Sequence, residues 1–163
     1  MTVPNLKRNR ECGDCKECCT GTLHADIYGK IMDKGRPCHY LGGEGCTIYE
    51  KRPGVCKAYA CEWLRDDSTL IPEWMRPDLS KVIITQKGWG DNLQHNYWNI
   101  AESHQKIDSV ILNWVYMYTS SHNICANIEV DGRWYQMGPP EFVEYMQRSV
   151  SATYIYVIRR NKT

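Results

Sequence analysis

Cysteine is concentrated in the first part of this 163-residue chain. Of its 9 cysteines, all but Cys125 lie before residue 62. The crowded set is Cys12, Cys15, Cys18, Cys19, Cys38, Cys46, Cys56 and Cys61. Thiolates are soft, anionic donors that bind zinc and iron, and two cysteines separated by two residues reach one metal without distorting the backbone. The sequence therefore predicts that these eight residues bind metal.

The first four cysteines have the spacing C-x2-C-x2-C followed by an adjacent cysteine. Three thiolates at that spacing are typical first ligands of a bacterial ferredoxin cluster, whose fourth cysteine comes several residues later and precedes a proline. Here Cys19 follows Cys18 at once, and Thr20 comes next. Because adjacent side chains diverge, we expect Cys18 and Cys19 to serve different centres, or only one of them to ligate.

The later cysteines can complete whatever the first four begin, because the loops between them are short. Eight thiolates fit two tetrahedral zinc ions, one four-iron (4Fe-4S) cluster with a zinc ion, or one cluster with spare thiols. His39, beside Cys38, is a less favoured ligand, since a histidine in a polar loop is more often a bystander. Cys125, between Ile124 and Ala126, is expected to be a buried small hydrophobic residue.

Charge and composition exclude several classes of partner. Lys and Arg number 20 against 19 Asp and Glu, so the formal net charge of +1 gives no global attraction to nucleic acid or anionic lipid. A protein partner stays open, whereas the basic runs at 7–10 and 159–162 are expected to be solvated tails. No apolar run approaches the ~18 residues of a membrane-spanning helix. The first ten residues lack a secretory signal, so we expect a cytoplasmic protein without a disulfide framework.

Residues 1–66 are expected to form one irregular, turn-rich region. The region holds the eight clustered cysteines and few long apolar repeats. Such a segment buries too little apolar surface to offset the entropy that its chain loses on folding. Zinc binds finger peptides with a free energy of ~10–16 kcal/mol, which is enough to offset that loss. We therefore expect a metal-stapled region, meaning one held together by bound metal. Arg52 is expected to offset part of the negative charge of the thiolates.

Residues 67–163 have the pattern of an ordinary mixed α and β fold packed against the first region. Strands are predicted at 81–86 and 95–101 from their strand-like composition and the turn residues that bound them. Apolar residues at helical spacing predict an amphipathic helix over 109–120, with Asp108 as its N-terminal cap.

Asp131-Gly132 predicts a two-residue hairpin turn, because both central positions of a type I′ turn need positive φ. The hairpin joins strands at 126–130 and 133–137. Its predicted register pairs Ile128 with Tyr135 and Ala126 with Met137. A helix from Pro139 and a last strand over 152–158 follow. The expected fold class is α+β: an irregular, metal-stapled, cysteine-rich first half, then a small antiparallel sheet with two helices.

The ordered cysteines resemble those of a known family. Cys12-x2-Cys15-x2-Cys18-Cys19, followed by Cys38, Cys46, Cys56 and Cys61 with Tyr49, Arg52 and Pro53 between them, is similar to the YkgJ-like cysteine-cluster (CxxCxxCC) family. The resemblance covers about residues 12 to 78, including Trp63-Leu64 and Arg76-Pro77-Asp78. Members are described as zinc- or iron-chelating domains. The resemblance therefore implies zinc or an iron–sulfur cluster at the eight cysteines.

Three kinds of function remain open. The first is a protein whose iron–sulfur cluster, zinc or both are redox-active or support a metal-dependent reaction. The second is a zinc-stapled binding module, and the third is a structural or assembly component without chemistry. No nucleophile motif, phosphate loop or dinucleotide fingerprint is present, so catalysis is expected only through the metal. The sequence assigns no catalytic residue.

Overall fold

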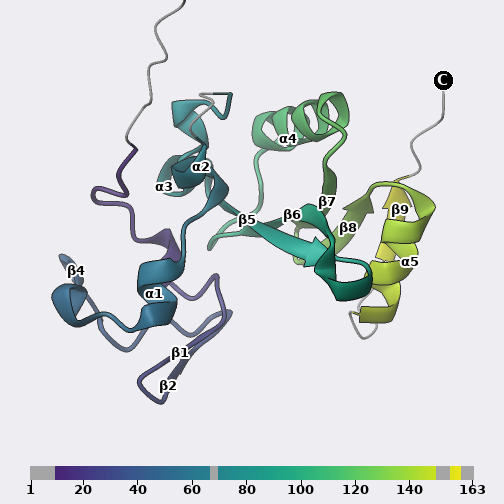
Figure 1. Cartoon of the computed structure of the whole chain (residues 1–163). Coiled ribbons are helices and arrows are strands. Elements are labelled where there is room, and N and C mark those ends of the chain that lie inside the picture. The colour runs from purple at the N-terminus through teal and green to yellow at the C-terminus, as the bar shows by residue number, and fades with distance from the viewer. Residues whose placement is uncertain (1–9, 67–69, 150–154, 159–163) are drawn as a thin grey trace, which may run out of the picture.

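The computed structural model of the chain describes residues 10–66, 70–149 and 155–158 (Figure 1). The cysteine-rich region lies beside one edge of a five-stranded sheet, whose helices α4 and α5 are drawn in green and yellow. Among the described residues, no helix is long and apolar enough to cross a membrane.

The cysteine-rich region consists of short elements joined by turns. They are η1 (Glu17–Cys19), β1 (Ala25–Ile27), β2 (Lys30–Met32), β3 (Leu41–Gly42), β4 (Gly45–Cys46), η2 (Tyr49–Lys51), α1 (Gly54–Ala58) and α2 (Glu62–Arg65). Strands β1 and β2 pair as one antiparallel hairpin, and β3 and β4 as another. Between residues 10 and 62, Ile27 and Met32 are the buried hydrophobic residues of the described chain. This region therefore has almost no apolar core of its own.

A connecting segment and the sheet follow. The segment carries η3 (Glu73–Met75) and α3 (Pro77–Ser80), and the sheet region contains β5 (Val82–Trp89), η4 (Asp91–Leu93), β6 (His95–Glu102), α4 (Ser109–Ser121), β7 (Cys125–Val130), β8 (Arg133–Met137), α5 (Pro140–Ser149) and β9 (Ile155–Ile158). The strand order is β5-β6-β7-β8-β9. Of the predicted last strand, residues 152–154 lie outside the described residues.

The structure agrees with the predicted α+β class, but the sheet that was expected to be antiparallel is mixed. Strands β5 and β6 pair antiparallel, as do β7 and β8, but β6 pairs with β7 and β8 with β9 in parallel. The reason lies in the connections, because α4 and α5 each carry the chain back along the sheet before the next strand begins. The chain is therefore mixed α and β, with two hairpin-type and two crossover-type pairings.

Local sequence patterns correctly predicted the hairpin at β7 and β8 and the long helix α4. Asp131 and Gly132 have φ of 53° and 73°, as the predicted type I′ turn requires. The register also agrees with the prediction, since Ile128 lies opposite Tyr135 and Ala126 opposite Met137. At α4, the side chain of Asp108 accepts a hydrogen bond from the backbone N–H of Val110 at 2.7 Å.

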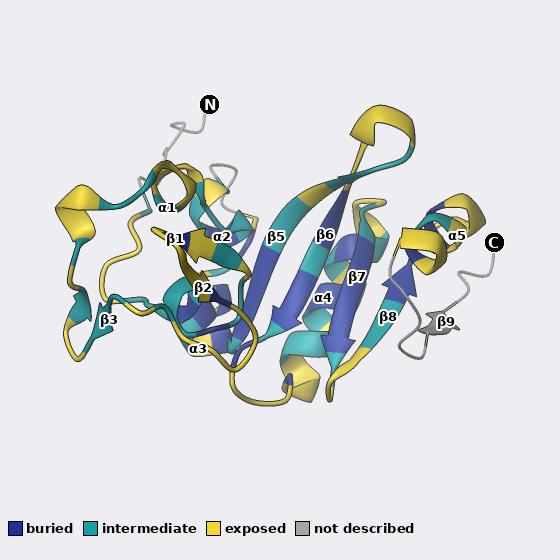
Figure 2. Ribbon diagram, turned by 90° about the horizontal axis from the view of Figure 1, so that it is seen from below, coloured by how far each residue is buried: buried dark blue, intermediate teal, exposed yellow. Residues whose placement is uncertain are grey.

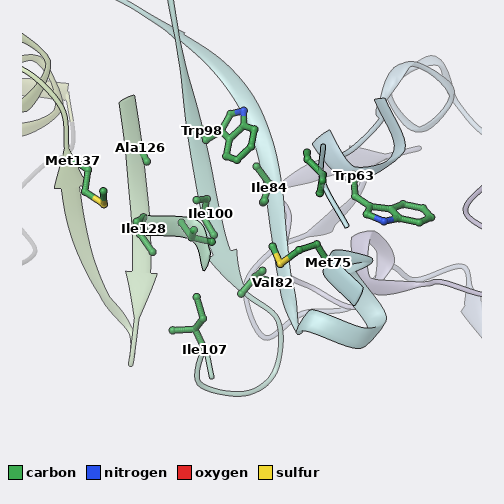
Figure 3. Packing of buried hydrophobic residues seen from close by; sticks show 12 residues of the cluster. Trp63, Met75, Val82, Ile84, Trp98, Ile100, Ile107, Ala126, Ile128 and Met137 are labelled. Atoms are coloured by element: carbon green, nitrogen blue, oxygen red, sulfur yellow. The ribbon is translucent and has the colours of Figure 1, made fainter. Parts of the chain in front are cut away.

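The main core lies between the sheet and α4. Alternate residues of the strands face it, and Figure 3 shows Val82, Ile84, Trp98 and Ile100 on adjacent strands with Met75 beside β5. Each fully buried side chain of this kind contributes about 1.5–3 kcal/mol. Burial differs between the two regions. Figure 2 shows buried strands in the sheet, whereas most residues of the cysteine-rich region are exposed or half-buried.

Helix α5 covers the opposite face with a smaller cluster. Phe142 and Met146 of α5 pack against Tyr97 of β6, and half-buried Cys125 at the start of β7 joins them. Cys125 thus packs as a small hydrophobic residue, as predicted, although it is not fully buried.

Polar contacts join the cysteine-rich region to the sheet. Buried Glu17 accepts a hydrogen bond from the hydroxyl of Ser103, which also bonds the Thr22 hydroxyl at 2.9 Å. Lys34 pairs with the carboxylate of Glu129, a fully buried β7 side chain. These contacts, which we call the seam, fix the cysteine-rich region against the sheet.

Candidate metal centre

All eight clustered cysteines lie in described parts of the chain and are free thiols. Cys12 is exposed and the other seven are half-buried. They come from separate short elements: Cys12 and Cys15 from the first loop, Cys18 and Cys19 from η1, Cys38 from the loop before β3, Cys46 from β4, Cys56 from α1 and Cys61 from the start of α2. The fold therefore gathers donors that are up to about fifty residues apart in sequence.

The first loop turns so that its thiols approach α2. The backbone N–H of Cys15 bonds the carbonyl of Cys12 at 3.0 Å, and Gly13 within this turn has φ of +55°, which glycine adopts readily. Burial raises the pKa of Cys61, and the nearby thiols of Cys12 and Cys15 raise it further. The backbone N–H groups of Leu64 and Trp63 act in the opposite direction by donating to the Cys61 sulfur.

A second group of thiols surrounds α1. Burial raises the pKa of Cys56, and so do the thiols of Cys19, Cys38 and Cys46. The backbone N–H of Cys38 bonds the carbonyl of Cys19 at 2.8 Å, which holds the loop before β3 against η1. Cys56 therefore lies near enough to three cysteines of other elements for their charges to affect it.

Cys18 and Cys19 do not diverge as expected. Their sulfur atoms are 3.8 Å apart, because both belong to the tight turn of η1. The contact with Cys19, followed by burial, raises the pKa of Cys18. The same contact lowers the pKa of Cys19 to about 7, and Arg52 lowers it as well.

Arg52 is a cation close to three of the thiols. Its guanidinium lies 3.7 Å from the ring centroid of Tyr49 and donates through Nε to the Tyr49 carbonyl at 3.0 Å. In this position it lowers the pKa of Cys12, Cys19 and Cys56. Burial raises the pKa of each of these thiols and has a larger effect than Arg52. Arg52 therefore offsets thiolate charge, as the sequence predicted.

Sequence reasoning assigned no role to the residues that support Cys15. Burial raises the pKa of Cys15, whereas backbone N–H groups of Glu17 and Asp78 donate to its sulfur. The Asp78 carboxylate also accepts a hydrogen bond from this thiol, and Arg76 holds that carboxylate with two bonds of 2.6 Å. Arg76 also contacts Asp14 at 3.3 Å. The only signal for this pair was the Arg76-Pro77-Asp78 motif within the resemblance.

The histidines near the thiols have other contacts. His39 is exposed and its ring packs edge-on against Tyr40 at 5.2 Å between centroids. His24 pairs with Asp33 at 3.6 Å. Across the described ranges, no three His, Cys, Asp or Glu side chains converge closely enough to form a ready metal site. Bound zinc lies about 2.3 Å from each sulfur, so metal binding would require these thiols to move closer together.

Comparison of the chain with protein-family models, with curated proteins and with solved structures finds no match. The resemblance to the YkgJ-like family rests on the spacing of the cysteines and stays a prediction. What the chain does is therefore inferred from its own thiols, charges and contacts.

Proposed function

We propose that the chain is a metal-binding protein whose eight clustered cysteines hold zinc, an iron–sulfur cluster or both. The observation that carries this proposal is the presence of eight free thiols, three of them close to the charge of Arg52, in a region with almost no apolar core. Soft thiolate donors in this number suit zinc and iron–sulfur clusters rather than magnesium or calcium. A reducing compartment such as the cytoplasm would keep these thiols available.

Two roles for the metal follow from its identity. An iron–sulfur cluster supplies a site for electron transfer, whereas tetrahedral zinc with four thiolates has no open position and supplies stability. The scarcity of buried hydrophobic residues between 10 and 62 supports the second role, in which a zinc-stapled region presents a binding or assembly surface. In either role the chain's own residues bind the metal, offset its charge through Arg52 and Arg76, and hold the loops in place.

Elemental analysis and an absorption spectrum of protein purified without oxygen test this proposal. Iron, sulfide and a broad band near ~400 nm would support the redox role. Colourless protein with stoichiometric zinc would support the stapling role. Protein that binds neither metal, even after reconstitution under reducing conditions, would refute the proposal.

Single substitutions test the ligand assignment. Cys15→Ser and Cys56→Ser each remove a thiol from the gathered set, so we expect each variant to lose metal or to lose structure in the cysteine-rich region. Cys125→Ser is the matched control, because Cys125 packs against aromatic residues on the far side of the sheet. Equal metal content in all three variants would contradict the assignment.

A further inference from the structure

We propose that a basic groove in the cysteine-rich region binds a small molecule that carries a phosphate group. The groove has a volume of about 400 Å³. Its lining consists of Gly29, Lys30, Ile31, Arg36, Pro37 and His39. None of these six residues is a cysteine, so the inference goes beyond metal binding and does not depend on it.

The polar side chains of the groove are cations or hydrogen-bond donors. Lys30 and Arg36 are exposed, and neither forms an ion pair with another residue that the structure describes. Elsewhere on the surface, Lys106 and Arg148 each pair with a carboxylate, at 2.8 and 3.2 Å. His39 adds a ring N–H, which imidazole carries in either protonation state. Two unpaired cations in a groove without an acidic lining residue favour an anionic ligand.

Asp33, which shares a turn with Arg36, is held by other groups. Its carboxylate accepts a hydrogen bond from the N–H of Lys34 at 2.8 Å and pairs with His24 at 3.6 Å. The bond from Lys34 is the main cause of the lowered pKa of Asp33, and the charge of Arg36 is a smaller one. Because a guanidinium has five N–H donors, Arg36 keeps donors available for a ligand.

One wall of the groove is the hairpin of β1 and β2, which Figure 1 shows below α1 on the side away from α4. Its turn has φ of 52° at Tyr28 and 77° at Gly29, as a two-residue type I′ turn requires. The Asp26 carboxylate accepts a bond from the N–H of Gly29 at 2.6 Å. The Tyr28 hydroxyl donates to the carbonyl of Lys51 at 2.7 Å, which ties the turn to η2. These bonds hold the backbone that carries Lys30.

The other wall is the turn that carries Arg36. The N–H of Arg36 bonds the Asp33 carbonyl at 2.7 Å, and its carbonyl accepts a bond from the Asp33 N–H at 3.1 Å. This turn packs on Gly21, which has φ of +92° and where a Cβ atom would lie 2.9 Å from the Asp33 carbonyl oxygen. A side chain at position 21 would therefore displace the turn. With both walls held, little ordering of the backbone has to accompany binding.

The chemistry of the lining favours a phosphate group on a small organic molecule. A guanidinium bonds two oxygens of a phosphate at once, and an ammonium adds a point charge. Ile31, which is 40% exposed, and Pro37 supply apolar surface for the organic part. The volume lies within the range of small-molecule sites, about 300–1,000 Å³. A long acidic polymer would need more cations than Lys30 and Arg36 supply.

Ligand-observed NMR on the protein as purified tests the groove, with phenyl phosphate as the probe. We expect phenyl phosphate to bind with millimolar affinity and inorganic phosphate to displace it, whereas phenol, which lacks the anionic group, should not bind. No binding of phenyl phosphate would overturn the proposal. Displacement by a polyglutamate peptide but not by inorganic phosphate would also overturn it, because that result would indicate an acidic protein partner.

Substitutions locate the bound phosphate. Arg36→Ala should weaken the binding of phenyl phosphate about tenfold or more, because it removes hydrogen bonds to a charged group. Lys30→Ala should weaken it too, and Arg36→Lys should retain only part of the affinity, since an ammonium group cannot form the paired bonds. Both side chains are exposed, so we expect these variants to fold.

Arg148→Ala is the matched control, because it removes the same charge from an exposed side chain of α5. It should leave the affinity for phenyl phosphate unchanged. Equal losses in Arg36→Ala, Lys30→Ala and Arg148→Ala would show that net charge alone attracts the probe and would overturn the proposal. Unchanged affinity in both groove variants would overturn it as well. Neither result would bear on metal binding by the cysteines.

Discussion

At the scale of single residues, the contact between Cys18 and Cys19 gives two identical side chains opposite properties. The contact raises the pKa of Cys18 and lowers that of Cys19 to about 7, with Arg52 adding to the second effect. A lowered pKa means that the thiolate forms at lower pH. Because the thiolate is both the nucleophile and the metal ligand, Cys19 is better prepared than Cys18 to react or to bind metal.

The metal-free chain should show this difference in its reaction with iodoacetamide. We expect alkylation of Cys19 to rise as the pH passes through about 7 and to be weak at pH 5, while Cys18 stays unreactive across that range. Peptide mapping after timed quenching measures both rates. Cys12 is the control. It is accessible to the reagent, but the partial burial of its thiol raises its pKa. If Cys12 reacts before Cys19 at pH 7, the assigned pKa order is wrong.

At the scale of elements, Arg10 attaches the first loop to α2 and η3. Its side chain is only 3% exposed and lies 4.8 Å from the ring centroid of Trp63. Its guanidinium donates to the carbonyls of Trp63 and Ile71 and pairs with Asp66 at 3.4 Å and Glu73 at 3.1 Å. Since Cys12 follows two residues later, this contact sets where the first thiol lies.

Arg10→Ala should therefore destabilise the chain and loosen Cys12. Removing one member of a buried ion pair costs about 3–5 kcal/mol, so we expect a loss of that order in the free energy of unfolding measured with urea. Arg10→Lys should recover only part of it, because an ammonium group cannot match the geometry of the guanidinium.

Arg148→Ala is the matched control for Arg10→Ala. Arg148 pairs with Glu144 at 3.2 Å on the surface, where its side chain is 79% exposed, and exposed pairs contribute about 0–1 kcal/mol. Equal effects of the two substitutions would show that Arg10 does not anchor the loop.

The elements that the sequence predicted well are those with a local cause. The turn at Asp131-Gly132, the cap at Asp108 and the apolar periodicity of α4 act within a few residues. The parallel pairings and the contacts of Arg10 depend instead on segments far apart in the chain, for which the sequence has no local pattern. The thiols were identified by their residue type and spacing, whereas their division into neighbours around Cys61 and around Cys56 needed the fold.

At the scale of the whole molecule, two regions with different sources of stability are joined by the seam. The sheet region has a continuous apolar core between its strands and α4, and Trp63 of α2 packs into it. Between residues 10 and 62, by contrast, the buried hydrophobic residues of the cysteine-rich region are Ile27 and Met32. Polar contacts at Glu17 and Lys34 join the two. Such contacts position the regions relative to each other. They contribute little of the stability that apolar burial would give the cysteine-rich region.

Metal removal should therefore affect the two regions unequally. After treatment with a strong chelator, we expect fast amide hydrogen exchange across residues 12–60, with protection retained in β5, β6, β7 and α4. Hydrogen exchange read by mass spectrometry, with and without added zinc, measures this. Cys125→Ser is the control and should behave as the unaltered chain in both conditions. Simultaneous loss of protection in both regions would mean that the sheet cannot persist alone.

The tight turn of η1 also couples the conformational freedom of its two cysteines. Cys18 and Cys19 occupy the same three-residue element, so an ion that fixes one of them also restricts the backbone of the other. The first binding event then removes conformational freedom that the second no longer has to remove. Metal binding through either cysteine of η1 is therefore expected to make binding through the other easier.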